Sequence, residues 1–381
     1  MTSITEALDS EIRTMSIECE RVGGINLSQG VCDTDVPVPV AEGAIAAILA
    51  GVNTYTRHDG LAALRTAIAG KLARDNGLTV DAETEIVVTA GSTGAFYCAC
   101  LALLSPGDEV IVLEPFYGYH VNTLVAVQAV PVPVPLAPPD WSFDVDAVER
   151  AVTSRTRAIL INTPGNPSGK LFSRQDLEAL GSLAARHDLI VFSDEIYEYF
   201  VYDGCEHISP ASLPALAGRT VIVSGYSKTF SITGWRIGYA VCRADWAERI
   251  GHFSDLVYVC APAPLQLGVA RGIEELGPEY YAGLRTDYAA KRDVICDALR
   301  AGGLTPFVPK GAYYVLADAS RVPGESSRER ARALLKMTGV ASVPGDSFFH
   351  AGRGELLLRF CFAKRTPVLA DACARLAAAH P

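Results

Sequence analysis

Residues 224–236 combine one lysine with an arginine eight residues later, among small residues. An apolar run at 220–223 leads into a Gly/Ser turn, and Lys228 lies just past that turn. A lysine in such a position can lose its proton on desolvation and attack a carbonyl to form a Schiff base. Arg236 carries a planar fork of donors suited to the phosphate of a cofactor joined through that bond. An ordinary solvated lysine and arginine on a loop would look the same, because short motifs also match by chance.

Two further groups have the types expected around such a cofactor. Gly91, Ser92 and Thr93 open a predicted helix, whose free N–H groups and positive dipole end bind phosphate. A simple Ser/Thr helix cap explains them equally well. Asp194 ends an apolar strand, where a buried carboxylate would stabilise a protonated ring nitrogen and keep a pyridine ring electron-poor. The alternative is that the Asp194 carboxylate only caps a helix or turn, a role that the neighbouring Glu195 could fill equally well.

Four side chains have types that suit contact with the ring or the substrate. Asn166 and Tyr197 can hydrogen-bond a phenolic oxygen, although Asn-Pro also starts turns and a core tyrosine would look the same. Tyr117 could stack on the ring face, or simply pack in the core. Arg359 follows an apolar strand-like run, and its guanidinium could bind a substrate carboxylate with two parallel hydrogen bonds. Taken alone, a surface arginine in a basic group is the simpler interpretation of Arg359.

The elements that position these groups alternate between strands and helices. Short Val/Ile-rich runs predict the buried strands of a mostly parallel sheet; they lie at 85–89, 109–113, 129–134, 158–161, 189–193 and 220–223. Helical patterns separate several of them, for example at 94–104 and 175–187. This alternation predicts an α/β layered domain. The proline-rich run at 131–139 is typical of an edge strand that leaves into a loop.

Each candidate group follows the end of one of these strands. Ligands of α/β sheets bind beyond the C-terminal ends of the strands. The segments 90–94, 115–117 and 162–169 should therefore gather at one end of the sheet, together with Asp194 and Lys228. Chance would seldom arrange so many suitable residues at one end, so we predict a single site there.

The chain of 381 residues is long enough for about two domains. From about residue 281 a long amphipathic helix introduces a mixture of strands and helices, which we interpret as a smaller α+β domain. We predict an N-terminal arm that joins the small domain at 1–45, a large cofactor-binding domain at 46–285, and the small domain at 286–381.

Composition limits the classes of function. Apolar residues make up 49% and charged residues 20%, as in a globular enzyme, and the net charge of −10 argues against nucleic-acid or anionic-membrane partners. The ten scattered cysteines form no Cys/His cluster that would bind a metal, and they suit reduced thiols in a cytoplasm. We see neither a secretory signal at the start nor an uninterrupted apolar run of about 18 residues.

In the motifs that contain these residues, the sequence closely resembles the class I/II aminotransferases, which are fold type I pyridoxal 5′-phosphate (PLP) enzymes. The resemblance extends from Asn26 to about Leu376. Residues 227–239 resemble the lysine signature of that family, 166–169 its Asn-Pro-Thr-Gly element, and 194–197 its Asp-x-x-Tyr element. The segment 26–33 is most similar to the kynurenine/glutamine transaminase and methionine aminotransferase group.

The resemblance implies further roles for residues of this chain. It implies that Ser227 contacts the cofactor and that Gly30 and Arg359 hold the substrate carboxylate. It also implies that Asn166 lies near both the substrate carboxylate and the cofactor. Residues 53–65 resemble the stretch whose tyrosine, here Tyr55, reaches the phosphate in the neighbouring subunit, which implies a homodimer. The sequence departs from the relatives at 31–34, which borders the substrate, and at Gly225, where some carry a serine.

The expectation is a cytoplasmic aminotransferase that moves the amino group of an L-α-amino acid to a 2-oxo acid by a ping-pong mechanism through a Lys228 Schiff base. Lys228, Asp194 and Tyr197 are the expected catalytic residues. A β-eliminating lyase of the cysteine-S-conjugate type on the same scaffold is the alternative. A regulatory protein with an aminotransferase-like fold is a second alternative, and such a protein would carry a DNA-binding module before that fold. A nucleotide-binding protein is a third alternative, but its phosphate loop would need a different glycine spacing around Gly91. No basic residue for a second substrate carboxylate is evident.

Overall fold

The computed structural model describes residues 11–379, so the first ten residues of the predicted N-terminal arm lie outside it. Seven strands form the larger sheet in the order β2-β8-β7-β6-β5-β3-β4. They are β2 (Ile86–Ala90), β3 (Glu109–Glu114), β4 (Val130–Pro135), β5 (Thr156–Asn162), β6 (Ile190–Asp194), β7 (Thr220–Gly225) and β8 (Ile237–Val241). All run in one direction except β8, which is antiparallel to β2 and β7. The predicted, mostly parallel sheet is therefore confirmed, whereas β8 was not predicted.

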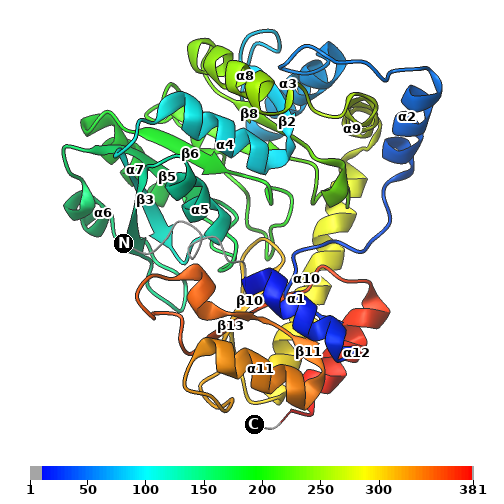
Figure 1. The fold of residues 1–381 in the computed structure, drawn as a ribbon, viewed down its shortest axis with the longest axis vertical. Coiled ribbons are helices and arrows are strands. Elements are labelled where there is room, and N and C mark those ends of the chain that lie inside the picture. Colours follow the sequence, from blue (N-terminus) through cyan, green and yellow to red (C-terminus); the bar gives the residue numbers. More distant parts are fainter. Residues whose placement is uncertain (1–10, 380–381) are drawn as a thin grey trace.

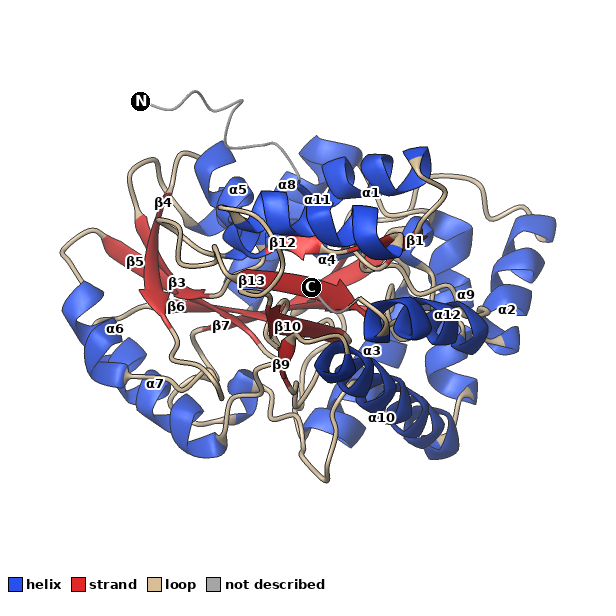
Figure 2. Ribbon diagram, turned by 90° about the horizontal axis from the view of Figure 1, so that it is seen from below, coloured by secondary structure: helices blue, strands red, loops and turns tan. Residues whose placement is uncertain are grey.

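Both faces of this sheet are buried, which explains the continuous apolar runs of its strands. Along β3, for example, Val110 and Val112 join one core cluster, while Ile111 and Leu113 join another on the opposite face. The first cluster packs under α4 (Gly91–Leu103), α5 (Gly118–Ala126) and α8 (Ala244–Tyr258). The second packs under α6 (Val145–Ala151) and α7 (Arg174–Arg186). Figure 2 shows these two groups of helices on opposite sides of the strands.

The proline-rich strand β4 lies at the edge of the sheet, as predicted, and pairs only with β3. Prolines alternate along it at 131, 133 and 135. A proline has no N–H to donate to a neighbouring strand, so such a sequence is tolerated only where one side of the strand has no partner.

A second, smaller sheet has the order β12-β13-β10-β9. Its strands are β9 (Thr305–Phe307), β10 (Tyr314–Asp318), β12 (Val343–Pro344) and β13 (Leu357–Cys361), all antiparallel to their neighbours. Three helices cover it: α10 (Pro278–Ala301), α11 (Ser327–Thr338) and α12 (Thr366–Ala377). The first elements of the described chain also belong here, because β1 (Ile25–Asn26) pairs with β11 (Val340–Ala341) and α1 (Glu11–Arg21) packs beside them.

The long helix α10 extends from the part with the larger sheet into the part with the smaller one (Figure 1), so Tyr281 near its start packs in one core cluster and Ile295 and Leu299 in another. Alongside the larger sheet lie α3 (Ala62–Asn76) and α9 (Ala263–Glu275), and α2 (Val38–Leu49) packs on α9. The division of the chain at residues 45 and 285 remains our proposal, and its second boundary would lie within α10. Within residues 11–379, no helix is both long and apolar enough to cross a membrane.

Candidate active site

A cavity of about 430 Å³ lies at the C-terminal ends of the parallel strands. It gathers residues from five strand ends, from the N-terminal segment and from the small sheet. The predicted residues that line it are Gly30, Ser92, Thr93, Tyr117, Asn166, Asp194, Tyr197, Ser227, Lys228, Arg236 and Arg359. Gly91 lies against Arg236, just behind the wall. Tyr55 lies outside the cavity of its own chain, and it is 82% exposed.

The antiparallel strand β8 explains why Arg236 reaches the site. Because β8 runs against its neighbours, its N-terminal end lies at the edge where the other strands end, and Arg236 directly precedes it. The guanidinium donates to the carbonyl of Thr233 at 2.9 Å and to that of Ala90 at 3.4 Å. No carboxylate within the described residues pairs with it, so its charge is free to bind an anion.

Gly91 is required by the close approach of Arg236 to the first turn of α4. Its φ is +76°, and a Cβ there would lie 2.2 Å from Arg236 Nη2. We expect Gly91→Ala to displace the guanidinium and to raise the dissociation constant of a bound phosphate-bearing cofactor about tenfold, the effect of one lost charge-assisted hydrogen bond. Gly70→Ala on α3 is the matched control, because a Cβ there meets nothing within 4 Å. Equal affinity in the two variants would contradict this account of Gly91.

Lys228 projects into the cavity from the turn after β7. Its Nζ donates to the Gly30 carbonyl at 3.0 Å, and no carboxylate contacts it directly among residues 11–379. Desolvation of the amine is the largest influence on its pKa, which is lowered from the ordinary value of a lysine. The unprotonated amine is the nucleophilic form, so this environment favours attack on a carbonyl.

Asp194 ends β6 and is 6% exposed. One carboxylate oxygen faces His120 Nε2 at 2.9 Å, and the other accepts a hydrogen bond from the Ile196 N–H at 3.2 Å. Glu195, the alternative, is not among the cavity residues, and it accepts hydrogen bonds from the hydroxyls of Ser193 and Ser209. Of the two neighbouring acids, the structure therefore directs Asp194 alone toward the cavity.

Arg359 is buried, at 1% exposure, so it is not the surface arginine that its basic neighbours suggested. It donates to Asn166 Oδ1 at 2.9 Å and to the Ser28 carbonyl. Its guanidinium lies over the rings of Tyr314 and Phe348, 4.4 and 4.9 Å from their centroids. These contacts fix the plane of the guanidinium at one wall of the cavity.

Two tyrosines complete that wall. The hydroxyls of Tyr197 and Tyr314 are 2.9 Å apart, and burial raises the pKa of both well above the usual tyrosine range. Gly30 packs directly against Tyr314, because an added Cβ would lie 1.9 Å from its hydroxyl oxygen. A side chain at position 30 would therefore displace Tyr314.

Three further residues at the cavity were not predicted from the sequence: His120, Tyr314 and Arg13. His120 lies in the first turn of α5, just after the predicted Tyr117, and it contacts Asp194. Its position shortly after the end of a strand could have indicated a place in the site. Tyr314 lies on β10, two positions from Leu316, which pairs with Arg359, so both side chains share one face of the small sheet. Arg13 on α1 also lines the cavity, and no sequence pattern places it there.

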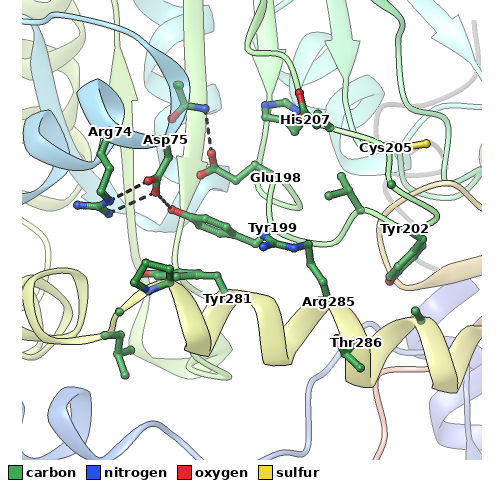
Figure 3. A pocket seen from close by; sticks show the side chains of 18 of the residues that line it. Arg74, Asp75, Glu198, Tyr199, Tyr202, Cys205, His207, Tyr281, Arg285 and Thr286 are labelled. Atoms are coloured by element: carbon green, nitrogen blue, oxygen red, sulfur yellow. Dashed lines mark hydrogen bonds and ion pairs between the residues drawn. The ribbon is translucent and has the colours of Figure 1, made fainter.

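A larger cavity of about 1000 Å³ lies elsewhere, between the end of α3, the loop after β6 and the start of α10 (Figure 3). Asp75 accepts hydrogen bonds from the Tyr199 hydroxyl at 2.6 Å and from Arg74 Nε at 2.8 Å. Glu198 accepts one from Asn76 Nδ2 at 3.2 Å. These acids are satisfied by the protein itself, and none of the predicted site residues lines this cavity. Size alone therefore does not identify the active site.

The sequence from residue 22 to residue 376 matches the family model for aminotransferase class I and II. The chain belongs to this family. It is 36% identical to the probable N-succinyldiaminopimelate aminotransferase of Mycobacterium tuberculosis over 95% of this chain and 94% of the relative. A solved structure of that M. tuberculosis aminotransferase covers 99% of both chains with a TM-score of 0.95 and 35% identity.

Two other relatives confirm the predicted resemblance within the family. The methionine aminotransferase of Escherichia coli is 34% identical over 95% of this chain and 94% of its own length. Kynurenine–oxoglutarate transaminase 3 of the rat is 33% identical over 91% of this chain and 82% of its own length. The chain is thus a PLP-dependent aminotransferase of fold type I.

The cavity residues fit the cofactor of this family. Ser227 Oγ and Arg359 Nε are buried without a hydrogen-bond partner among the described residues, so both are free to bind a ligand. Arg236 offers an uncompensated positive charge for a phosphate, and the Lys228 amine has its pKa lowered as an aldehyde-binding lysine requires. The side chains of this cavity therefore fit PLP.

Proposed function

We propose that this aminotransferase acts on L-α-amino acids and 2-oxo acids with Lys228, Asp194 and Tyr197 as its catalytic residues. The observation that supports this most strongly is the shared cavity, in which an amine with a lowered pKa accompanies one buried acid and two arginines. When bound, PLP supplies an aldehyde that takes up amino groups and a protonated pyridine ring that accepts electrons.

The protein residues would hold the cofactor at three places. Lys228 would hold the aldehyde end, and Arg236 would hold the phosphate with Ser92, Thr93 and Ser227. Asp194, oriented by His120, would bind the protonated ring nitrogen, because a carboxylate stabilises a nearby cation. Asn166 and Tyr197 would donate hydrogen bonds to the phenolic oxygen, with Tyr117 against the ring.

The substrate would be oriented by Arg359 and the Gly30 backbone, which also line the cavity. Arg359 would bind the α-carboxylate through its fork of donors, next to the Gly30 backbone. This orientation would direct the Cα–H bond at Lys228. Once the substrate amine has taken its place at the aldehyde, the free Lys228 Nζ would remove the proton from the substrate α-carbon as a general base. The same amine would return a proton in the second half of the exchange.

Replacing Arg359 by lysine keeps the charge but removes the planar fork. We expect Arg359→Lys to raise KM for both the amino donor and the oxo acid by about tenfold to hundredfold, the range for losing a charge-assisted hydrogen bond. Steady-state kinetics with both substrates measures this change, and the melting temperature shows whether the variant is folded. A folded variant with unchanged KM for both substrates would refute the carboxylate role.

We further propose a cytoplasmic homodimer in which Tyr55 of one subunit reaches the phosphate of the other. In support, Tyr55 is exposed and lies outside its own cavity, and the ten cysteines are free thiols of which most are buried. Light scattering of the holoenzyme measures the oligomeric state, and a monomer with full activity would contradict the shared site.

A panel of amino donors and 2-oxo acids tests the proposed function as a whole. We expect a new amino acid to form for each equivalent of donor consumed. The β-eliminating alternative predicts ammonia and pyruvate from donors with a β-substituent, with no new amino acid. The relatives from M. tuberculosis, E. coli and the rat are all named as aminotransferases or transaminases and give that alternative no support.

A further inference from the structure

The active-site cavity contains more positive charge than the proposed reaction uses. Four basic side chains line it, namely Arg13, Lys228, Arg236 and Arg359, whereas Asp194 is the one acid among the described residues that do so. The proposed function assigns Lys228 to the aldehyde, Arg236 to the phosphate and Arg359 to the α-carboxylate. Arg13 is left without a role, and no described residue forms an ion pair with it.

The helix that carries Arg13 is fixed in place. Helix α1 buries Met15 and Cys19 against the small domain. Two ion pairs join it to α11: Glu11 with Arg328, and Glu18 with Arg332 at 2.7 Å. A side chain on such a supported helix has a more defined position than one on a loop.

Glu11 and Glu18 are thus paired with α11 and do not line the cavity, whereas Arg13 lines it together with Ile12. No carboxylate of residues 11–379 forms an ion pair with Arg13. A guanidinium free of internal partners, at the wall of a cavity that already has an arginine for one carboxylate, is complementary to a second carboxylate of the same substrate.

We propose that Arg13 binds the carboxylate at the far end of a dicarboxylic substrate and thereby sets the preference of the enzyme for acidic over uncharged side chains. This inference rests on the proposed function, because it assumes that Arg359 takes the α-carboxylate. It supplies the second basic residue that the sequence alone did not reveal. The Ile12 side chain beside it would cover the apolar stem of the substrate.

Two oxo acids that differ only at the far end test the proposal. In 2-oxohexanoate an ethyl group replaces the second carboxylate of 2-oxoglutarate, so the ratio of their kcat/KM values isolates the charge. The wild-type holoenzyme should prefer 2-oxoglutarate. We expect Arg13→Gln to lower that ratio about tenfold to hundredfold, as for the loss of a charge-assisted hydrogen bond, and Arg13→Lys to lower it less.

Arg21→Gln is the matched control, because Arg21 lies at the other end of α1 and outside the cavity. It should keep the wild-type ratio. A wild type that prefers 2-oxohexanoate, or an Arg13→Gln variant whose ratio stays within twofold of the wild type, would overturn the role of Arg13. Failure to transfer an amino group from any donor to any 2-oxo acid of the panel would instead overturn the proposed function.

Discussion

Lys228→Ala is expected to lower turnover about 10⁴-fold, the upper range for loss of a general acid–base group. The lysine is proposed both to hold the cofactor and to move the α-proton, and no other lysine lines the cavity among the described residues. Single-turnover transfer from an amino donor measures the loss. The visible absorbance of the lysine-bound cofactor should disappear in the same variant.

A small primary amine added to Lys228→Ala provides a sharper test. If the missing group acts as a base at the α-carbon, the amine should restore part of the turnover and the rate should rise with the concentration of its unprotonated form. Lys336→Ala, at an exposed position on α11, is the control and should behave as wild type. Unchanged turnover in Lys228→Ala would contradict the assignment.

Asp194→Asn has the second largest expected effect. The change keeps the size of the side chain but removes the negative charge that is proposed to hold the ring nitrogen protonated. We expect kcat to fall about 10²- to 10³-fold, as when one preorganised electrostatic contact is lost from an active site. Steady-state kcat at saturating cofactor measures this effect without interference from weaker binding.

Glu195→Gln is the matched control for Asp194→Asn. Glu195 is the next residue and is also buried, but its carboxylate contacts Ser193, Ser209 and His207 and does not line the cavity. Its replacement should lower the melting temperature and leave kcat of the folded enzyme within a fewfold of wild type. Equal losses of kcat in the two variants would show that the charge of Asp194 has no special role.

The sequence predicted much of the larger sheet because its signals are local. Six Val/Ile-rich runs correspond to the six parallel strands, since a strand buried on both faces leaves no polar alternation in its sequence. Parallel strands place their C-terminal ends together, which is why Asp194 and Lys228 could be assigned to one site from their positions after strands.

The remaining features depend on packing between distant segments. The antiparallel direction of β8, which brings Arg236 to the cavity, is set by its two neighbours and leaves no trace in its own residues. The burial of Arg359 depends on Asn166, Tyr314 and Phe348, which come from other elements. The position of Arg13 depends on the packing of α1 against the small domain, through buried Met15 and Cys19 and through contacts with α11, about 315 residues away in the chain.

The most direct test of the account is to reduce the holoenzyme with borohydride and to locate the cofactor by peptide mass spectrometry. We expect one equivalent of the reduced cofactor per chain, attached at Lys228. Attachment at any other lysine, or a chain that remains unlabelled after saturation with PLP, would contradict it.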